Sequence, residues 1–285
     1  MGALSRALSR GSLRAATSGG LRCGLWTLLA WALPLCVPAL AQAQAQVDDA
    51  VVRLETRPGV LMPVYLMRRP GAVALVLLLS GGRGGMGRLD DGQPTSRNFL
   101  VRSREFFAQA GFDVAVLGLP ADKKEGWSAQ DRLGAEHLED LRSVVRRLKA
   151  ASGLPVWLVG TSMGTVSATA AAIAFGQQEL AGVVLTSSIT GRQKLGAVPT
   201  QDLAAIRIPV LVLHHARDGC TFCSPAEAAN IPQWLTGAPV RRFILAEGGG
   251  GATGDPCEAL HHHGFIGMEQ EAVRLIADWI RHPVP

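Results

Sequence analysis

The sequence has no acidic residue before Asp48, although the same stretch contains four arginines, Arg6, Arg10, Arg14 and Arg22. The apolar stretch that follows, residues 25–40, is interrupted by two prolines and is shorter than the ~20 apolar residues that span a bilayer. Small residues come next, as Ala39-Leu40-Ala41 or Ala41-Gln42-Ala43. A positive segment, a short apolar segment and small residues predict a signal peptide over residues 1–41, with cleavage near 41–43. An uncleaved membrane anchor is the alternative.

The rest of the chain has little excess charge of either sign. The formal net charge is +5, so loss of the four leader arginines leaves 5 − 4 = +1. The basic character therefore belongs to the leader, and we expect neither nucleic acid as a partner nor stable membrane insertion after leader removal. Export predicts a periplasmic or secreted protein. The oligomeric state is not predicted.

Cysteine is scarce, and Cys23 and Cys36 leave with the leader. Cys220, Cys223 and Cys257 remain, which allows at most one disulfide within the chain. Cys220 and Cys223 form a C-x-x-C pair, but the sequence has no second such pair to complete a zinc site. A redox motif and a zinc site that uses residues 261–263 are alternatives to a structural disulfide, which we favour in an oxidising compartment. We expect no metal and no cofactor.

The chain also lacks a phosphate-binding motif. The glycine cluster SGGRGGMG, residues 80–87, matches neither G-x-x-x-x-G-K-[ST] nor G-x-G-x-x-G opening into a helix. Glycines after a buried strand instead favour an oxyanion loop, where a backbone N–H approaches developing negative charge. Gly82 is the better candidate for that donor. A structural glycine turn is the alternative.

Apolar runs alternate with helical patterns along the remaining chain. The predicted strands are two in residues 51–69, around a turn at 57–59, and one each at 72–79, 113–120, 154–159, 181–188, 208–215 and 240–247. The predicted helices are 98–112, 133–151, one beginning near 164, 225–236 and 268–280, with a loop at 121–132. Unbroken apolar runs such as 72–79 suit strands that are covered on both faces.

This alternation predicts the fold class α/β, with a doubly wound, mostly parallel sheet of about eight strands and helices on both faces. About twenty residues separate Ser188 from Ile208, which is too few for a large cap domain. The sequence shows no repeat. We therefore expect a single domain over residues 47–285 with an open site.

The stretch LPVWLVGTSMGTVSATA, residues 154–170, contains the motif G-x-S-x-G at 160–164. A strand, a sharp turn with glycines and a helix together predict a nucleophile elbow with Ser162 as the nucleophile. Gly160 and Gly164 would give the cramped serine room. The structural alternative is an ordinary serine in a strand-to-helix loop.

An acid and a base follow in the chain order that this arrangement requires. Asp218 comes just after strand 208–215, where it is a candidate to orient a histidine, or a simple Asp-Gly turn. Three consecutive histidines, His261, His262 and His263, follow strand 240–247. They could also bind metal or be merely exposed. We favour His263 as the base, because the following Gly-Phe allows a tight turn and a buried anchor. Other histidines, His214 and His215 among them, receive structural interpretations.

From about residue 70 to 281 the chain resembles the α/β-hydrolase superfamily, on the segments GTSMG (160–164), HHARDGC (214–220) and DPCEALHHHGFIGMEQEAV (255–273). They are similar to an exported bacterial branch with few characterised members. The resemblance implies a triad of Ser162, Asp218 and His263, with His-Gly-Phe-x-Gly at 263–267 as its third site. The superfamily fixes a fold and a style of reaction rather than a substrate. Ser80 departs from it, since many relatives have histidine or proline before the glycines.

These expectations together predict an exported serine hydrolase acting on a small-molecule acyl substrate. His263 would deprotonate Ser162, and the N–H groups of Gly82 and Met163 would hold the oxyanion. Serine favours an ester, thioester or amide substrate, with carboxylic esters first. A non-catalytic binding protein and an acyltransferase are the alternatives. If the triad forms, its acid and histidine loops meet, and a disulfide from Cys220 or Cys223 to Cys257 would join them and stabilise the fold by roughly 3–4 kcal/mol.

Overall fold

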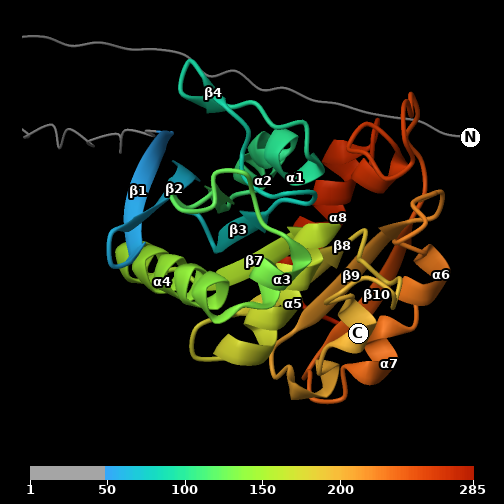
Figure 1. The fold of residues 1–285 in the computed structure, drawn as a ribbon. Helices are drawn as coiled ribbons and strands as arrows, with labels where there is room; N and C mark the ends of the chain where they lie inside the picture. The colour runs from blue at the N-terminus through green and yellow to red at the C-terminus, as the bar shows by residue number, and fades with distance from the viewer. Residues whose placement is uncertain (1–48) are drawn as a thin grey trace, which may run out of the picture. The chain divides into compact units, whose positions relative to one another are not determined.

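An eight-stranded sheet runs through residues 49–285, the part of the chain that the computed structural model describes (Figure 1). The leader predicted over residues 1–41 and its cleavage site lie outside the described residues. The strand order is β1-β2-β6-β3-β7-β8-β9-β10. The strands are β1 (Ala50–Arg57), β2 (Val60–Met67), β3 (Leu75–Leu79), β6 (Asp113–Leu117), β7 (Val156–Thr161), β8 (Gly182–Thr186), β9 (Val210–His215) and β10 (Arg241–Ala246). From β6 to β10 neighbouring strands are parallel, and β2 pairs antiparallel with both β1 and β6.

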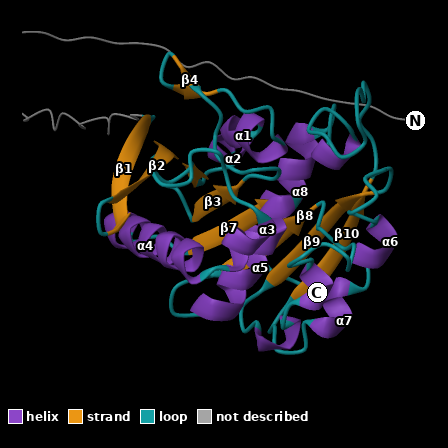
Figure 2. Cartoon of the chain, viewed as in Figure 1, coloured by secondary structure: helices purple, strands orange, loops and turns teal. Residues whose placement is uncertain are grey.

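Helices cover both faces of the sheet, because its central strands are apolar on both sides. Every residue of β3, β6, β7, β8 and β9 is buried. On one face, α4 (Ala135–Ser152) and α5 (Met163–Phe175) pack on the strands (Figure 2). On the other face lie α1 (Phe99–Arg102), α2 (Arg104–Gln109) and α8 (Glu269–Arg281). The predicted doubly wound α/β fold is confirmed.

Three predicted segments differ from the structure. The helix expected over 98–112 divides at Ser103, whose backbone (φ −94°, ψ 4°) leaves the helical region. The loop expected over 121–132 runs into a short helix, α3 (Ala129–Leu133), which begins with a capping box between Ser128 and Asp131. The helix expected over 225–236 is two short helices, α6 (Pro225–Ala228) and α7 (Ile231–Trp234), because Pro232 cannot continue a helix from the preceding turn.

A small hairpin, β4 (Leu89–Asp90) with β5 (Gln93–Pro94), also went unpredicted. Between β8 and β9 the described chain forms only short turns, η1 (Val198–Thr200) and η2 (Leu203–Ala205), and no large cap domain covers the described sheet. Within residues 49–285 no helix has the length and apolar character needed to cross a membrane.

The carboxyl ends of the parallel strands gather the predicted site residues. The glycine loop follows β3, Ser162 follows β7, Asp218 follows β9, and the three histidines follow β10. Carboxyl ends of parallel strands lie at the same edge of a sheet, which is where ligands bind in open α/β folds. The topology therefore brings Ser162, Asp218 and His263 to one edge. Asp218 lies 56 positions after Ser162 in the sequence and 45 positions before His263.

Candidate active site

Ser162 lies in a strained turn between β7 and α5. Its backbone has φ 52° and ψ −125°, a conformation that costs a non-glycine residue on the order of 1–3 kcal/mol. Glycines on both sides make the turn sterically allowed. A β-carbon at Gly164 would collide with the Leu79 carbonyl oxygen, and one at Gly160 would lie 2.6 Å from the Gly164 carbonyl oxygen. The G-x-S-x-G pattern is thus a packing requirement, and it presents the serine side chain above the N-terminus of α5.

Asp218 and His263 form a buried hydrogen-bonded pair. His263 Nδ1 lies 2.9 Å from Asp218 Oδ2, and the Cys220 N–H donates to Asp218 Oδ1 at 3.0 Å. Burial alone would raise the pKa of Asp218. Hydrogen bonds from His214 and His263 outweigh it and hold that pKa well below its usual range. The carboxylate is therefore ionised at neutral pH and accepts from the histidine ring.

The three consecutive histidines have different surroundings. Only His263 of the three contacts Asp218, and it lies in the short helical turn η3 (His262–Gly264). The His262 ring stacks on His215, with ring centroids 4.6 Å apart, and the His261 ring meets His262 edge-on. Phe265, fully buried, packs against Phe99 at 4.8 Å between ring centroids. This anchor holds the histidine turn against α1.

His214, which the sequence analysis treated as structural, also contacts the Asp218 carboxylate. Its Nε2 lies 3.1 Å from Asp218 Oδ2 and 3.0 Å from the Cys223 carbonyl oxygen. Both neighbours are acceptors, so Nε2 carries the proton. His214 ends β9 four residues before Asp218 and is completely buried. It therefore helps to fix the same carboxylate oxygen that His263 contacts, a role that its place at a strand end did not indicate.

A buried arginine lies behind the glycine loop. Arg132 donates from Nη2 to the Gly82 carbonyl oxygen at 3.0 Å and to the Ser80 carbonyl oxygen at 3.4 Å. Burial lowers its pKa to about 10, so it remains a cation at neutral pH. None of the carboxylates in residues 49–285 forms an ion pair with it. The sequence did not point to Arg132, because this residue lies in the segment that was predicted to be a loop.

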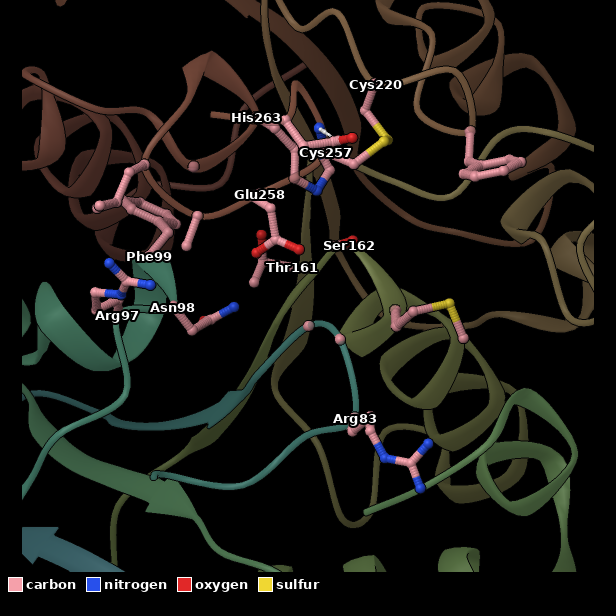
Figure 3. A pocket seen from close by; sticks show the side chains of 18 of the residues that line it. Arg83, Arg97, Asn98, Phe99, Thr161, Ser162, Cys220, Cys257, Glu258 and His263 are labelled. Atoms are coloured by element: carbon pink, nitrogen blue, oxygen red, sulfur yellow. Dashed lines mark hydrogen bonds between the residues drawn. A yellow bond between two sulfur atoms is a disulfide. The ribbon is translucent and has the colours of Figure 1, made fainter. Parts of the chain in front are cut away.

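Ser162 and His263 both line one open pocket of about 690 Å³ (Figure 3). Gly82 and Met163, the predicted oxyanion donors, line the same pocket. The His263 Nε2 atom is buried and has no hydrogen-bond partner among residues 49–285. The pocket walls also contain charged side chains, which are Arg83, Arg97, Lys194, Asp255 and Glu258. His263, the strained Ser162 and the two residues with the predicted oxyanion donors thus line the same volume.

Comparisons with known proteins agree with this architecture. No protein-family model and no curated protein sequence matches the chain. A dienelactone hydrolase from Anabaena variabilis superposes with TM-score 0.60 at 18% identity, over 84% of this chain and 100% of that one. An esterase from Pyrococcus furiosus gives 0.61 at 14% identity, over 83% and 91%. A cold-adapted esterase from an Arctic intertidal metagenomic library gives 0.53 at 14% identity, over 80% and 91%.

These three neighbours are members of one superfamily, the α/β hydrolases. The chain has the α/β-hydrolase fold. The resemblance carried by residues 160–164, 214–220 and 255–273 is therefore confirmed at the level of the fold.

Within this α/β-hydrolase fold, a disulfide joins the acid loop to the histidine loop. It links Cys220 to Cys257, whose Cα atoms are 4.4 Å apart, and so decides the pairing that the sequence left open. Cys223 is free and fully buried. Burial, reinforced by the nearby Asp218 carboxylate, raises the pKa of the Cys223 thiol well above its usual range, while the Ser162 hydroxyl acts in the opposite direction. The thiol is neutral at physiological pH, which makes it a poor nucleophile.

Proposed function

We propose that the protein is an exported serine hydrolase that cleaves an ester, thioester or amide through an acyl-enzyme, with carboxylic esters as the preferred substrates. Three observations support the reaction class: the strained Ser162, the Asp218–His263 pair and the shared pocket. Two of the structural neighbours are named as esterases and one as a dienelactone hydrolase, which favours ester substrates by analogy. The predicted leader supports a periplasmic or secreted location.

The single observation that carries the proposal is the state of His263. Its Nδ1 is held by an ionised carboxylate, while its Nε2 faces the serine pocket without a partner. That is the arrangement a general base needs, because the carboxylate fixes the tautomer and stabilises the imidazolium as it forms. His214 also hydrogen-bonds to that carboxylate.

In the first step, His263 Nε2 accepts the hydroxyl proton as Ser162 Oγ attacks the acyl carbon. The ring then carries a positive charge next to Asp218. The oxyanion of the tetrahedral intermediate accepts hydrogen bonds from the N–H groups of Met163 and Gly82. Met163 is the first residue of α5, so its N–H has no partner within the helix. Collapse of the intermediate transfers the proton from His263 to the leaving group, and water then releases the acyl group by the same steps.

A fluorophosphonate probe tests this proposal, because it labels only an activated serine. We expect stoichiometric labelling of the wild type, none in Ser162→Ala, and a labelling rate about 10⁴-fold lower in His263→Ala. His262→Ala is the matched control, since His262 lies beside the proposed base yet contacts neither Asp218 nor Ser162. It should retain labelling within a few-fold.

A folded wild-type protein that resists the probe would refute the triad and favour the non-catalytic binding alternative. Equal labelling of His263→Ala and His262→Ala would mean that the base is misassigned. Turnover of a panel of short and long acyl esters, with an added alcohol as acceptor, then separates a hydrolase from an acyltransferase.

A further inference from the structure

Three metal-ligating side chains meet beside the proposed catalytic serine. One ligand atom from each of Cys220, Cys223 and His263 lies within 4.8 Å of the other two, and all three residues are buried. The sulfur of Cys257 is bonded to that of Cys220 and therefore lies next to this cluster. The proposed hydrolytic mechanism uses none of these sulfur atoms. The chemistry of the three cysteines is therefore independent of the hydrolytic steps.

The disulfide decides what this cluster can bind. While Cys220 and Cys257 are joined, neither sulfur can become a thiolate ligand. Only Cys223 and the free Nε2 of His263 then remain as donors. Two donors fall short of the four that zinc takes in protein sites.

We propose that reduction of the Cys220–Cys257 disulfide by a dithiol converts this cluster into a zinc site that captures His263. The dithiol supplies two electrons and two protons, becomes a disulfide itself, and leaves thiols on Cys220 and Cys257. Zn²⁺ then binds the sulfurs of Cys220, Cys223 and Cys257 together with His263 Nε2, and three thiol protons pass to solvent. The product is a tetrahedral Cys₃His site.

The spacing of the ligands suits a zinc ion. Tetrahedral coordination with Zn–S bonds of about 2.3 Å places neighbouring ligand atoms about 3.7 Å apart. The ligand atoms of Cys220, Cys223 and His263 already lie within 4.8 Å of one another and need to move by only about 1 Å. Cys257 is not part of that cluster, and its sulfur must move away from Cys220 once the disulfide is reduced. Cys220 and Cys223 also have the C-x-x-C spacing that zinc sites use, and they form a tight turn in which the Cys223 N–H donates to the Cys220 carbonyl oxygen at 3.0 Å.

The surroundings of His263 suit a zinc ligand as well. Zinc-bound histidines commonly donate their other ring nitrogen to a carboxylate, which fixes the tautomer and raises the basicity of the ligand. Asp218 already accepts from His263 Nδ1 at 2.9 Å. The pair that activates a base for hydrolysis therefore also prepares a zinc ligand, and the disulfide keeps that second use from occurring.

Cobalt binding provides a test that does not depend on hydrolysis. The full-length protein is reduced with a dithiol, desalted under argon and titrated with Co²⁺. We expect one equivalent of Co²⁺ to bind with thiolate-to-cobalt charge-transfer absorption and the visible bands of a tetrahedral site. Addition of Zn²⁺ should bleach both. The oxidised protein, titrated in the same way, should show neither.

Variants identify the ligands. Cys223→Ser and His263→Ala should each weaken Co²⁺ binding by about tenfold or more, and Asp218→Asn by about 10–100-fold through the orientation of His263. His261→Ala is the matched histidine control, and the double variant Cys23→Ser/Cys36→Ser controls for the leader thiols. Both controls should bind Co²⁺ as the wild type does. Circular dichroism verifies folding, and His263→Gln replaces His263→Ala if the latter is unfolded.

Absence of the charge-transfer band in reduced, folded wild type would overturn the proposal. So would affinities unchanged by both Cys223→Ser and His263→Ala. A further consequence rests on the proposed function: Zn²⁺ should abolish fluorophosphonate labelling of the reduced protein, a chelator should restore it, and the oxidised protein should be insensitive. A protein that binds Co²⁺ but never reacts with the probe would refute the hydrolase and leave the zinc site intact.

Discussion

A chain of hydrogen bonds beneath the glycine loop fixes the protonation state of His137. Arg132 Nη1 donates to Ser167 Oγ at 2.9 Å, so the hydroxyl proton of Ser167 is free to point to His137 Nε2, also at 2.9 Å. His137 is buried against Trp127. Burial, together with the Arg132 charge, lowers the pKa of His137 to about 3. The ring is therefore neutral in the folded protein.

This buried histidine should make stability fall on mild acidification. Between its ordinary pKa of 6.5 and the folded pKa of about 3, the unfolded chain binds a proton that the folded chain does not. The free energy of unfolding therefore decreases as pH drops through that window, by up to about 1.4 kcal/mol per pH unit. His137→Gln keeps an acceptor for Ser167 and removes the titrating ring. We expect a flatter pH dependence of the urea unfolding free energy between pH 6.5 and 4.

The comparison isolates His137 because the other titrating groups are present in both proteins. His215 and His262, whose pKa values burial also lowers, contribute equally to both slopes. His282→Gln, an exposed substitution near the end of the chain, serves as the control and should keep the wild-type slope. Equal slopes for His137→Gln and wild type would show that His137 is charged in the folded protein.

Local signals were sufficient to point to some residues of the candidate site and not to others. Ser162 could be predicted because its neighbouring glycines are required by the turn itself. Asp218 and His263 could be predicted from their order after successive strands, and the structure places them in contact. His214 and Arg132 could not, because their partners are defined only by packing. Arg132, for example, contacts Gly82 and Ser167, which lie 50 and 35 residues away.

At the scale of elements, periodicity predicted the buried strands well. An unbroken apolar run such as residues 75–79 has few alternatives to a covered strand. The short helices were harder, because a break at one residue leaves the apolar period intact. Ser103 interrupts the predicted helix 98–112 without any loss of apolar residues on its buried face. The short helix α3 was missed although Ser128 and Asp131 form a recognisable capping box, since few apolar residues surround it.

The short helix α3 matters because it brings Arg132 to the back of the glycine loop, the proposed oxyanion loop. Arg132→Met keeps the side-chain length but removes the donors to Gly82 and Ser80. The glycine loop then loses its hydrogen bonds to Arg132, and the Gly82 N–H moves away from the position that we propose for the oxyanion. Because this N–H would stabilise the transition state rather than the bound substrate, we expect kcat on an ester substrate to fall by about 10–100-fold with little change in KM. Steady-state kinetics and the rate of fluorophosphonate labelling measure both effects.

Arg132→Lys separates charge from geometry. Lysine retains a cation but cannot reach both carbonyl oxygens with a planar fork, so it should rescue kcat only in part. Arg146→Met, which removes an exposed arginine from α4, is the matched control and should be neutral. An Arg132→Met protein that folds with wild-type kcat would show that the glycine loop holds its shape without the arginine.

At the scale of the whole molecule, the disulfide connects the Asp218 loop to the His263 loop across 37 residues of chain. That segment includes β10 and both short helices before it. In the chain-entropy view, such a closed loop stabilises the folded state by roughly 3–4 kcal/mol. For a chain of this size the loss corresponds to a decrease in Tm of roughly 10 °C. The sequence showed that the bond could form but could not show which cysteine would pair, since both candidates lie in one turn.

The double variant Cys220→Ala/Cys257→Ala should show this loss in thermal and urea unfolding with a chelator present. Activity of the folded variant at 25 °C should remain within about tenfold of wild type, because a large loss of activity would require His263 to be misplaced. Two other contacts hold His263 in position. Asp218 accepts a hydrogen bond from its Nδ1, and the Ser187 hydroxyl donates to its carbonyl oxygen at 2.7 Å. A phosphine reductant should lower the Tm of the wild type to that of the variant and leave the variant unchanged. If the reductant left the wild-type Tm unaltered while free-thiol titration showed the bond reduced, the disulfide would not stabilise the fold, and its stability would come from the core alone.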